Sequence, residues 1–252
     1  MAAPELRVIG LTGLPDIRPG DDIAALTLEA VERQGIRLRR TGDVLVVTQK
    51  IVSKAEGRVV ALADVEPGEE AARLAQETEK DPRVVELILR ESRRIVRQAG
   101  PVLITETRHG FVCANAGVDA SNVGRGLVSL LPEDPDRSAV EIRAGLRERA
   151  GLEVAVVVSD TFGRPWREGH TNVAVGIAGM DAFVDYVGQV DPYGYDLRVS
   201  TLAVADELAG AAELVMGKLS GVPAAIIRGY EYPRGSGTAR DMIRPAERDL
   251  FR

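Results

Sequence analysis

The chain has 252 residues, of which 45% are hydrophobic and 28% charged, with a formal net charge of -6 and a sequence pI of about 5.2. This composition is typical of a folded globular protein and argues against long disordered tails and against a protein that works by binding nucleic acid. The one cysteine, Cys113, excludes an internal disulfide and a cysteine-pair zinc site. The N-terminus lacks a signal-peptide pattern and no apolar run approaches the ~20 residues that span a bilayer, so we expect a cytoplasmic protein without membrane contact.

The first half of the chain alternates β-branched runs with amphipathic stretches. Before the polar loop around Pro67-Gly68, the pattern predicts a strand at 6–11, a helix at 22–34, a strand at 44–48 after a turn at 41–43, and helical spacing at 49–54. Beyond that loop, it predicts a surface helix over 83–98 and a β-hairpin formed by 102–105 and 111–114.

A glycine-rich segment, 115–126, separates these elements from the second half. The breaker cluster at 132–136 is followed by a predicted helix at 138–149, and we place a lobe boundary near 132–151. The remaining expected elements are a buried strand at 154–159, an irregular polar loop at 160–169, an apolar run at 173–179, a helix at 201–214 and a strand at 224–227.

Two acidic segments are candidates for a metal site. Asp119 and Asn122 lie between glycines and offer hard oxygen donors, which suit magnesium, manganese or calcium; the alternative is a surface turn whose side chains cap their own backbone. Asp160 and Thr161 follow a buried strand, where functional groups collect in α/β folds, and Arg164 and Arg167 could pair with a phosphate or carboxylate. The alternative for this second segment is a helix N-cap with solvated arginines.

Lys50 and Lys54 share a face if residues 49–54 are helical, which would create a positive patch for an anion; solvated surface lysines are the alternative. Neither a P-loop nor a GxGxxG pattern after an early strand is present. His109 and His170 have no spaced ligand partners, so a surface role is expected, and Cys113 lies in an apolar run typical of an inert buried thiol.

Six motifs in order resemble one family. They are GLPDIRPGDD at 13–22, VVTQKIVSKAEGR at 46–58, AGVDASNVG at 116–124, SDTFGRPWREG at 159–169, DPYG at 191–194 and VMGKLSGVP at 215–223. The series covers almost the whole chain and resembles the coenzyme F-420-0:L-glutamate ligases, the gamma-glutamyl ligases of deazaflavin cofactor biosynthesis. The resemblance implies an α+β fold with mixed sheets and two lobes, which pairs into a homodimer.

The resemblance also implies the reaction and its site. Members of the family attach L-glutamate to the deazaflavin precursor through amide bonds, with GTP as co-substrate, magnesium or manganese as cofactor and potassium as an activator of some members. Asp119, Asp160 and Thr161 correspond to metal ligands. The implied GTP contacts are Leu14, Pro15, Asp16, Ile17, Gln49, Lys54, Asn122, Met216, Gly217, Lys218, Leu219, Ser220, Gly221, Val222 and Pro223. Lys50, Arg164 and Arg167 remain candidates for compensating phosphate or substrate charge.

Two residues differ from the family pattern. Gln49 replaces a small hydroxyl residue of some relatives, and Lys218 replaces a glutamine that helps to hold metal in archaeal relatives. A protonated lysine cannot ligate a cation, although it can provide charge to a phosphate. The 252 residues contain no C-terminal nitroreductase-like domain, so ligation alone is expected. Two alternatives stay open at this point: a related nucleotide-dependent amide ligase that acts on another acid, and a GTP-binding regulator without catalytic activity.

Overall fold

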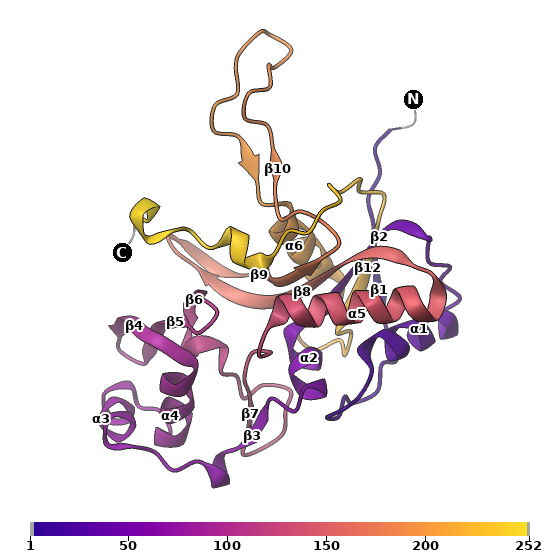
Figure 1. Cartoon of the computed structure of the whole chain (residues 1–252). Coiled ribbons are helices and arrows are strands. Elements are labelled where there is room, and N and C mark those ends of the chain that lie inside the picture. Colours follow the sequence, from indigo (N-terminus) through magenta and orange to yellow (C-terminus); the bar gives the residue numbers. More distant parts are fainter. Residues whose placement is uncertain (1–2, 251–252) are drawn as a thin grey trace.

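A central mixed sheet forms the main body of the protein (Figure 1). The computed structural model describes residues 3–250. The sheet has the strand order β1 (Arg7–Leu11), β12 (Ala224–Arg228), β2 (Thr41–Thr48), β8 (Glu153–Arg164) and β9 (Arg167–Ala178). Since β12 is antiparallel to both β1 and β2, and β2 is parallel to β8, the strands β1, β2 and β8 end at the same edge. That edge collects the residues that follow these strands.

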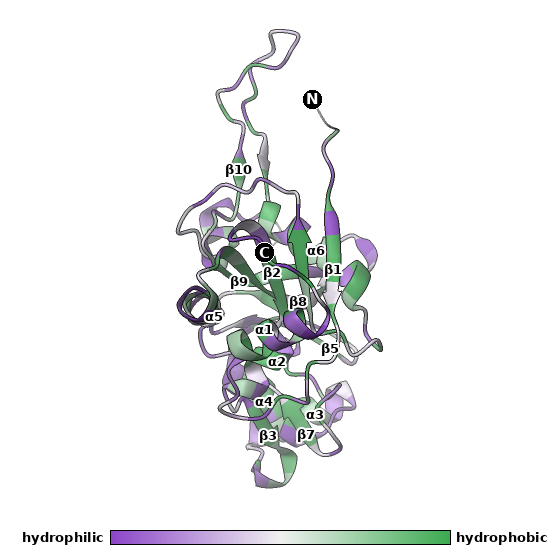
Figure 2. Cartoon of the chain, turned by 90° about the vertical axis from the view of Figure 1, so that its right-hand side faces the viewer, coloured by the Kyte–Doolittle hydropathy of each residue, from purple (hydrophilic) through white to green (hydrophobic). Residues whose placement is uncertain are grey.

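Helices cover both faces of this sheet. α1 (Ile23–Arg33) and α5 (Pro135–Ala150) pack together on one face, and α6 (Val204–Met216) packs on the other. Both faces of the central strands are therefore buried, which explains the unbroken apolar run of β8 and the hydrophobic colouring of β2 and β8 in Figure 2. Asp22 and Asp134 cap the N-termini of α1 and α5, and Gly151 ends α5 in a left-handed conformation with φ of 64°.

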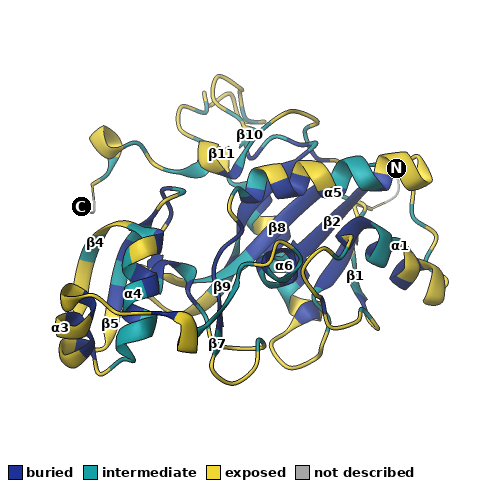
Figure 3. Ribbon diagram, turned by 60° about the horizontal axis from the view of Figure 1, so that its bottom comes forward, coloured by how far each residue is buried: buried dark blue, intermediate teal, exposed yellow. Residues whose placement is uncertain are grey.

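A second, separate hydrophobic cluster lies between α2 (Gln49–Ala55) and α5 in the sequence. Leu74, Val85, Ile88 and Leu103 are among its buried residues. The surrounding elements are β3 (Val59–Ala61), α3 (Glu69–Thr78), α4 (Pro82–Glu91), β4 (Ser92–Ala99), β5 (Val102–Thr107), β6 (Val112–Ala114) and β7 (Leu127–Ser129). Figure 3 shows the buried residues gathered in the main sheet and around α4, with α3 exposed on its outer side. A division of the chain into two lobes stays a prediction.

An extended arm projects from the main body between β10 (Val184–Asp185) and β11 (Thr201–Leu202), which pair with each other at its base (Figure 1). Short 3-10 helices complete the structure at Leu62–Asp64, Asn115–Gly117, Ala239–Met242 and Ala246–Arg248. Within residues 3–250, every helix is too short or too polar to cross a bilayer.

Most predicted elements are confirmed, but four predictions differ from the structure. Residues 83–98 form α4 and then β4, because the strand pairing of 92–99 with β5 prevails over the helical spacing of the apolar residues. The expected loop at 160–169 is instead a β-hairpin: β8 continues to Arg164 and β9 begins at Arg167, so Asp160 lies within a strand and caps no helix. The turn expected at 41–43 is the bulged start of β2, and α6 begins at Val204, after β11, rather than at 201.

Candidate active site

A cleft of about 710 Å³ lies at the edge of the sheet where β1, β2 and β8 end. Several chain segments line it besides β8: the loop after β1, the start of α2, the glycine-rich loop after β6, and the loop between α6 and β12. β9 and α6 add His170, Asn172 and Glu213 to the lining. The parallel pairing of β2 with β8 places Thr48 opposite Ser159, so the start of α2 lies beside Asp160. The N–H of Thr48 also donates to the carbonyl of Pro223 at 2.9 Å, which holds the loop after α6 against the same strand end.

Lys50, Asp119 and Ser121 form one charged cluster in the cleft. The Lys50 ammonium contacts the Asp119 carboxylate and donates to the carbonyl and hydroxyl oxygens of Ser121, both at 2.8 Å. Ser121 donates to the same carboxylate from its N–H at 2.8 Å and its hydroxyl at 2.7 Å. Burial opposes the ionisation of Asp119, but these hydrogen bonds and the charge of Lys50 outweigh it and lower the pKa of Asp119 below its ordinary value. Asp119 is therefore an anion at neutral pH.

Asp160 has the opposite electrostatic environment. Burial raises the pKa of Asp160 to about 6; the Asp119 carboxylate adds to this rise, whereas the N–H of Thr161 and the charges of Lys50 and Lys218 oppose it. The two acids lie 41 positions apart in the sequence (119 and 160), line the same cleft, and are near enough for the charge of Asp119 to act on Asp160. A carboxylate that is costly to ionise gains strongly from a bound cation, so Asp160 favours cation binding here.

A chain of polar contacts crosses the cleft beside Asp160. The Lys218 ammonium contacts the hydroxyl of Thr161, which donates to the side-chain oxygen of Asn172 at 2.7 Å. Asn172 donates in turn to the carboxylate of Glu213 in α6 at 3.0 Å. Asn172 is 3% exposed, so its partners fix the orientation of its amide. Sequence reasoning missed Asn172 and Glu213, because only the β8–β9 register and the packing of α6 bring them to Thr161.

The rim of the cleft carries further basic and polar groups. Lys54 donates to the Asp16 carboxylate at 2.6 Å, which connects α2 to the loop after β1 and lowers the pKa of Asp16 through that hydrogen bond and the lysine charge. Gln49 is buried and accepts a 2.8 Å hydrogen bond from Ser53. Residues of the cleft that the sequence did not single out as functional include Asn115, Ser121, Ser159 and His170.

The structure brings together most of the site residues expected from the sequence. The cleft is lined by Leu14, Pro15, Asp16, Ile17, Gln49, Lys50, Lys54, Asp119, Asn122, Asp160, Thr161, Gly217, Lys218, Leu219, Gly221, Val222 and Pro223. Met216 is fully buried beneath the lining, and Ser220 donates to the carbonyl of Met216. Arg164 and Arg167 lie away from the cleft at the exposed end of the β8–β9 hairpin, where Arg164 donates to the carbonyls of Glu168 and Gly169. The individual roles stay predictions.

The donor set suits a hard divalent cation. Asp119, Asp160 and Thr161 offer oxygen atoms, which magnesium and manganese prefer. Across residues 3–250, no three carboxylate, imidazole or thiol side chains lie close enough to hold a metal by themselves. A cation on the two acids would therefore complete its shell with hydroxyl, water or phosphate oxygens, as magnesium does in nucleotide sites.

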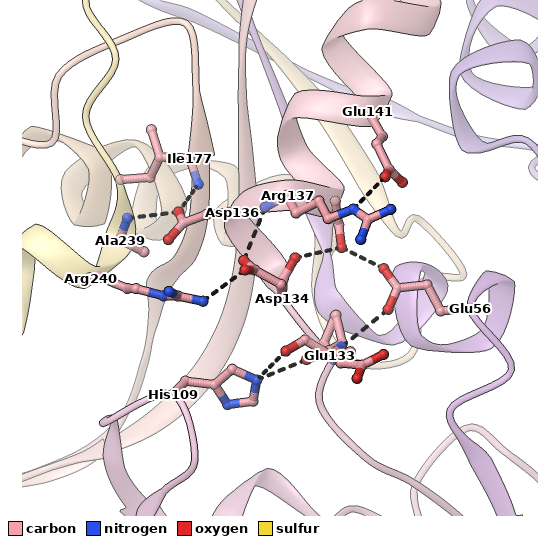
Figure 4. A network of polar contacts seen from close by, with 12 residues as sticks. Glu56, His109, Glu133, Asp134, Asp136, Arg137, Glu141, Ile177, Ala239 and Arg240 are labelled. Carbon is pink, nitrogen blue, oxygen red and sulfur yellow. Dashed lines mark hydrogen bonds and ion pairs between the residues drawn. The ribbon is translucent and has the colours of Figure 1, made fainter.

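Another cavity, of about 640 Å³, lies between α5 and residues 234–240. Its charges are largely neutralised: Arg137 pairs with Glu141, Arg143 with Glu153, and Arg240 with Asp134. Asp136 accepts hydrogen bonds from the N–H groups of Ile177 and Ala239 at 2.9 and 2.8 Å (Figure 4). These contacts join α5, β9 and the C-terminal segment, so this cavity is a structural junction.

His109 and Cys113 are surrounded by other protein groups: His109 contacts a backbone carbonyl and an aromatic ring, and Cys113 is buried. The His109 Nε2 atom lies 3.0 Å from the carbonyl oxygen of Pro132, and its ring stacks on Phe111 with centroids 5.8 Å apart. Cys113 is buried, as its apolar surroundings predict. Burial, with a contribution from the Asp160 charge, raises the pKa of the Cys113 thiol to about 12.

Cys113 is therefore expected to be unreactive in the folded protein. At pH 8 a thiol with this pKa has roughly 1,000-fold less thiolate than an ordinary cysteine, and burial restricts access further. Titration with Ellman's reagent should show at least about 100-fold slower reaction for the native protein than for the same protein in guanidinium chloride. Equal rates would contradict the buried placement.

Comparison with known proteins identifies the family of the chain. The model of the F420-0:gamma-glutamyl ligase family matches residues 12–229. A coenzyme F420:L-glutamate ligase of Methanothermobacter thermautotrophicus is 49% identical over 250 residues, which cover 98% of this chain and 99% of the relative. A ligase of the same name from Methanopyrus kandleri is 48% identical over 99% of this chain and 98% of the relative. A third, from Methanocaldococcus jannaschii, is 43% identical over 98% of this chain and 97% of the relative. With motifs, fold and full-length similarity in agreement, the chain belongs to the F420-0:gamma-glutamyl ligase family.

Proposed function

We propose that the chain is a GTP- and divalent-metal-dependent ligase that adds L-glutamate, and then further gamma-linked glutamates, to coenzyme F420-0. The observation that carries the proposal is the single cleft that joins Asp119 and Asp160 to Lys50, Lys54 and Lys218. Two relatives that match nearly the whole chain are named coenzyme F420:L-glutamate ligases. We infer the same acid and amine substrates for this chain.

The chemistry requires activation, because a carboxylate is a poor acyl donor. In the first step, a carboxylate oxygen of the precursor attacks the gamma-phosphorus of GTP, and GDP leaves. In the second, the nitrogen of glutamate attacks the resulting acyl phosphate, inorganic phosphate leaves, and the amine loses its protons to solvent or a base. A bound divalent cation supplies charge neutralisation to the phosphate oxygens in such transfers. The chain's own lysines provide further positive charge in the cleft.

We assign the nucleotide to the part of the cleft formed by the loop after β1, the start of α2 and the loop after α6. These segments supply Leu14, Gln49, Lys54 and Lys218 and correspond to the GTP-contacting positions implied by the family motifs. All substrates are anionic while the chain has a net charge of -6, so local cations must hold them. Potassium activation, expected from the resemblance, is tested by replacing potassium with sodium in the assay.

A panel of substrate pairs tests the proposed reaction. The full chain with GTP and Mn²⁺ should release GDP only when F420-0 and L-glutamate are both present, and mass spectrometry should show product masses increased by whole glutamate residues. Replacement of either substrate by another acid or amine should reduce GDP release at least about tenfold. Turnover with only another pair would favour a related amide ligase, and tight GTP binding without any turnover would favour a regulator.

We further propose that the protein forms a homodimer through the arm between β10 and β11. The arm exposes apolar side chains at Val187, Val190, Tyr193, Tyr195 and Val199, with exposed fractions between 50% and 94%. Exposed apolar groups concentrated on a projecting segment are typical of an interaction surface.

Replacement of residues 187–199 by a short glycine-serine linker is expected to convert the dimer to a monomer while the main sheet stays folded. Light scattering after size exclusion measures the mass, and circular dichroism checks the fold. A dimer that survives the replacement, or a monomeric wild-type protein, would contradict the assignment.

A further inference from the structure

Lys218 lies where the loop after α6 enters the cleft. Gly217 ends the helix with φ of 59° and ψ of 176°, a conformation that a residue with a side chain rarely adopts, and the turn directs Lys218 towards β8. The Lys218 ammonium contacts the Thr161 hydroxyl and lies 3.9 Å from a carboxylate oxygen of Glu213. A positive charge of the chain itself therefore lies beside the oxygen atoms of Thr161 and Glu213.

The hydrogen bonds around Thr161 show that its oxygen faces a cation. The hydroxyl proton of Thr161 is used in the 2.7 Å bond to Asn172, whose amide is oriented by its 3.0 Å bond to Glu213. The remaining lone pairs of Thr161 then point towards Lys218. Each group in this series therefore donates to the next: Lys218 to Thr161, Thr161 to Asn172, and Asn172 to Glu213.

A divalent cation bound to Thr161 would lie next to this ammonium. The two positive charges would repel each other at short range, and water screens part of this repulsion because the Lys218 side chain is 63% exposed. The ammonium also already satisfies the oxygen of Thr161. Asp119 and Asp160 line the same cleft and offer carboxylates, which attract a divalent cation more strongly than the hydroxyl of Thr161 does. Asp119 is in contact with Lys50. The Lys50 side chain is 16% exposed and also donates to Ser121, so a cation on Asp119 has to displace this ammonium from the carboxylate.

We propose that the Lys218 ammonium replaces a second divalent cation at Thr161, so that each chain binds one divalent cation, on Asp119 and Asp160. The inference rests on the proposed metal-dependent function and specifies its metal stoichiometry. One positive charge of the active site is then covalently attached to the protein and independent of the metal concentration. Within the proposed function, Lys218 supplies this charge to the phosphates of the bound nucleotide.

Metal counting with Mn²⁺ tests the proposal directly. Electron paramagnetic resonance titration of the full chain, with a non-hydrolysable GTP analogue present, should give one bound Mn²⁺ per chain. Lys218→Gln removes the charge and adds an oxygen ligand, so two Mn²⁺ per chain are expected. Lys218→Arg and Lys218→Met should each bind one, since neither adds a ligand. Lys80→Gln, which removes a lysine charge outside the cleft, is the matched control and should also bind one.

Activity measurements provide the second readout. Lys218→Met should reduce kcat about 100-fold or more, with little change in the Mn²⁺ affinity of the site on Asp119 and Asp160. Lys218→Gln should recover part of the activity at a high Mn²⁺ concentration. Thermal melting confirms that each variant is folded. Two Mn²⁺ per wild-type chain, one in Lys218→Gln, or unchanged kcat in Lys218→Met would each overturn the inference. A wild-type chain that binds no Mn²⁺ would instead contradict the proposed metal-dependent function itself.

Discussion

Asp160→Asn is expected to abolish ligation and, at the same time, to stabilise the metal-free protein at pH 8. Burial raises the pKa of Asp160 to about 6 from an ordinary value of 3.8, so the folded state binds a proton more tightly than the unfolded state. Stability therefore falls as the pH rises from about 4 to about 6, and the full penalty is present at pH 8. An asparagine has no such penalty, so the free energy of unfolding of Asp160→Asn should be higher than that of the wild type by about 1 to 3 kcal/mol at pH 8.

Thermal melts in the presence of EDTA at pH 8, 6 and 4.5 measure this effect. The advantage of Asp160→Asn should be largest at pH 8 and should shrink as the pH falls. Added Mn²⁺ should raise the melting temperature of the wild-type protein and leave that of the variant nearly unchanged, while kcat of the variant falls at least about 1,000-fold. Asp64→Asn, which changes an exposed acid outside the cleft, should alter none of these quantities. Undiminished turnover in Asp160→Asn would remove Asp160 from the site.

Asp43→Ala is expected to be the most destabilising single change outside the cleft. Asp43 is fully buried and accepts hydrogen bonds from Arg228 at 2.8 and 2.6 Å and from the N–H of Arg39 at 2.9 Å. This pair joins the start of β2 to the end of β12, which is its neighbour in the sheet. Loss of the carboxylate leaves Arg228 without its buried partner, and such a loss costs about 3–5 kcal/mol.

Equilibrium unfolding in guanidinium chloride, monitored by circular dichroism, tests this prediction. The double variant Asp43→Leu/Arg228→Met should recover much of the loss, because it removes both charges and keeps apolar volume. Glu77→Gln breaks the exposed pair with Arg73 in α3 and should leave the unfolding midpoint nearly unchanged, because solvent screens such a pair. A loss of under 1 kcal/mol in Asp43→Ala would show that the pair contributes little.

The cleft is built from parts that belong to different hydrophobic clusters. Asp160 lies in β8, within the main sheet, whereas Asp119 follows a segment whose Ala116 and Val118 pack in the second cluster. The contact between Lys50 and Asp119 connects the two parts across the cleft. A ligand that contacts both acids would add to this connection, so substrate binding is expected to stabilise the two parts together.

The sequence by itself was sufficient to predict the family, most of the helices and strands, and the two acids that line the cleft, Asp119 and Asp160. Local patterns were sufficient for these features: the apolar run of β8, the helical spacing of α1 and the glycines around Asp119 act over a few residues. The hairpin of β8 with β9 and the strand β4 were missed, because both depend on pairing with a partner strand rather than on local spacing.

Only the tertiary structure decided how the site is assembled. The parallel register of β2 and β8 brings Lys50 to Asp160, and the register of β8 with β9 brings Asn172 to Thr161. The packing of α6 adds Glu213, which lies 41 residues after its hydrogen-bond partner Asn172 in the sequence. The hairpin also carries Arg164 away from the cleft. These contacts join residues that are distant in sequence, and their free energy comes from burial of the whole sheet, which no local pattern encodes.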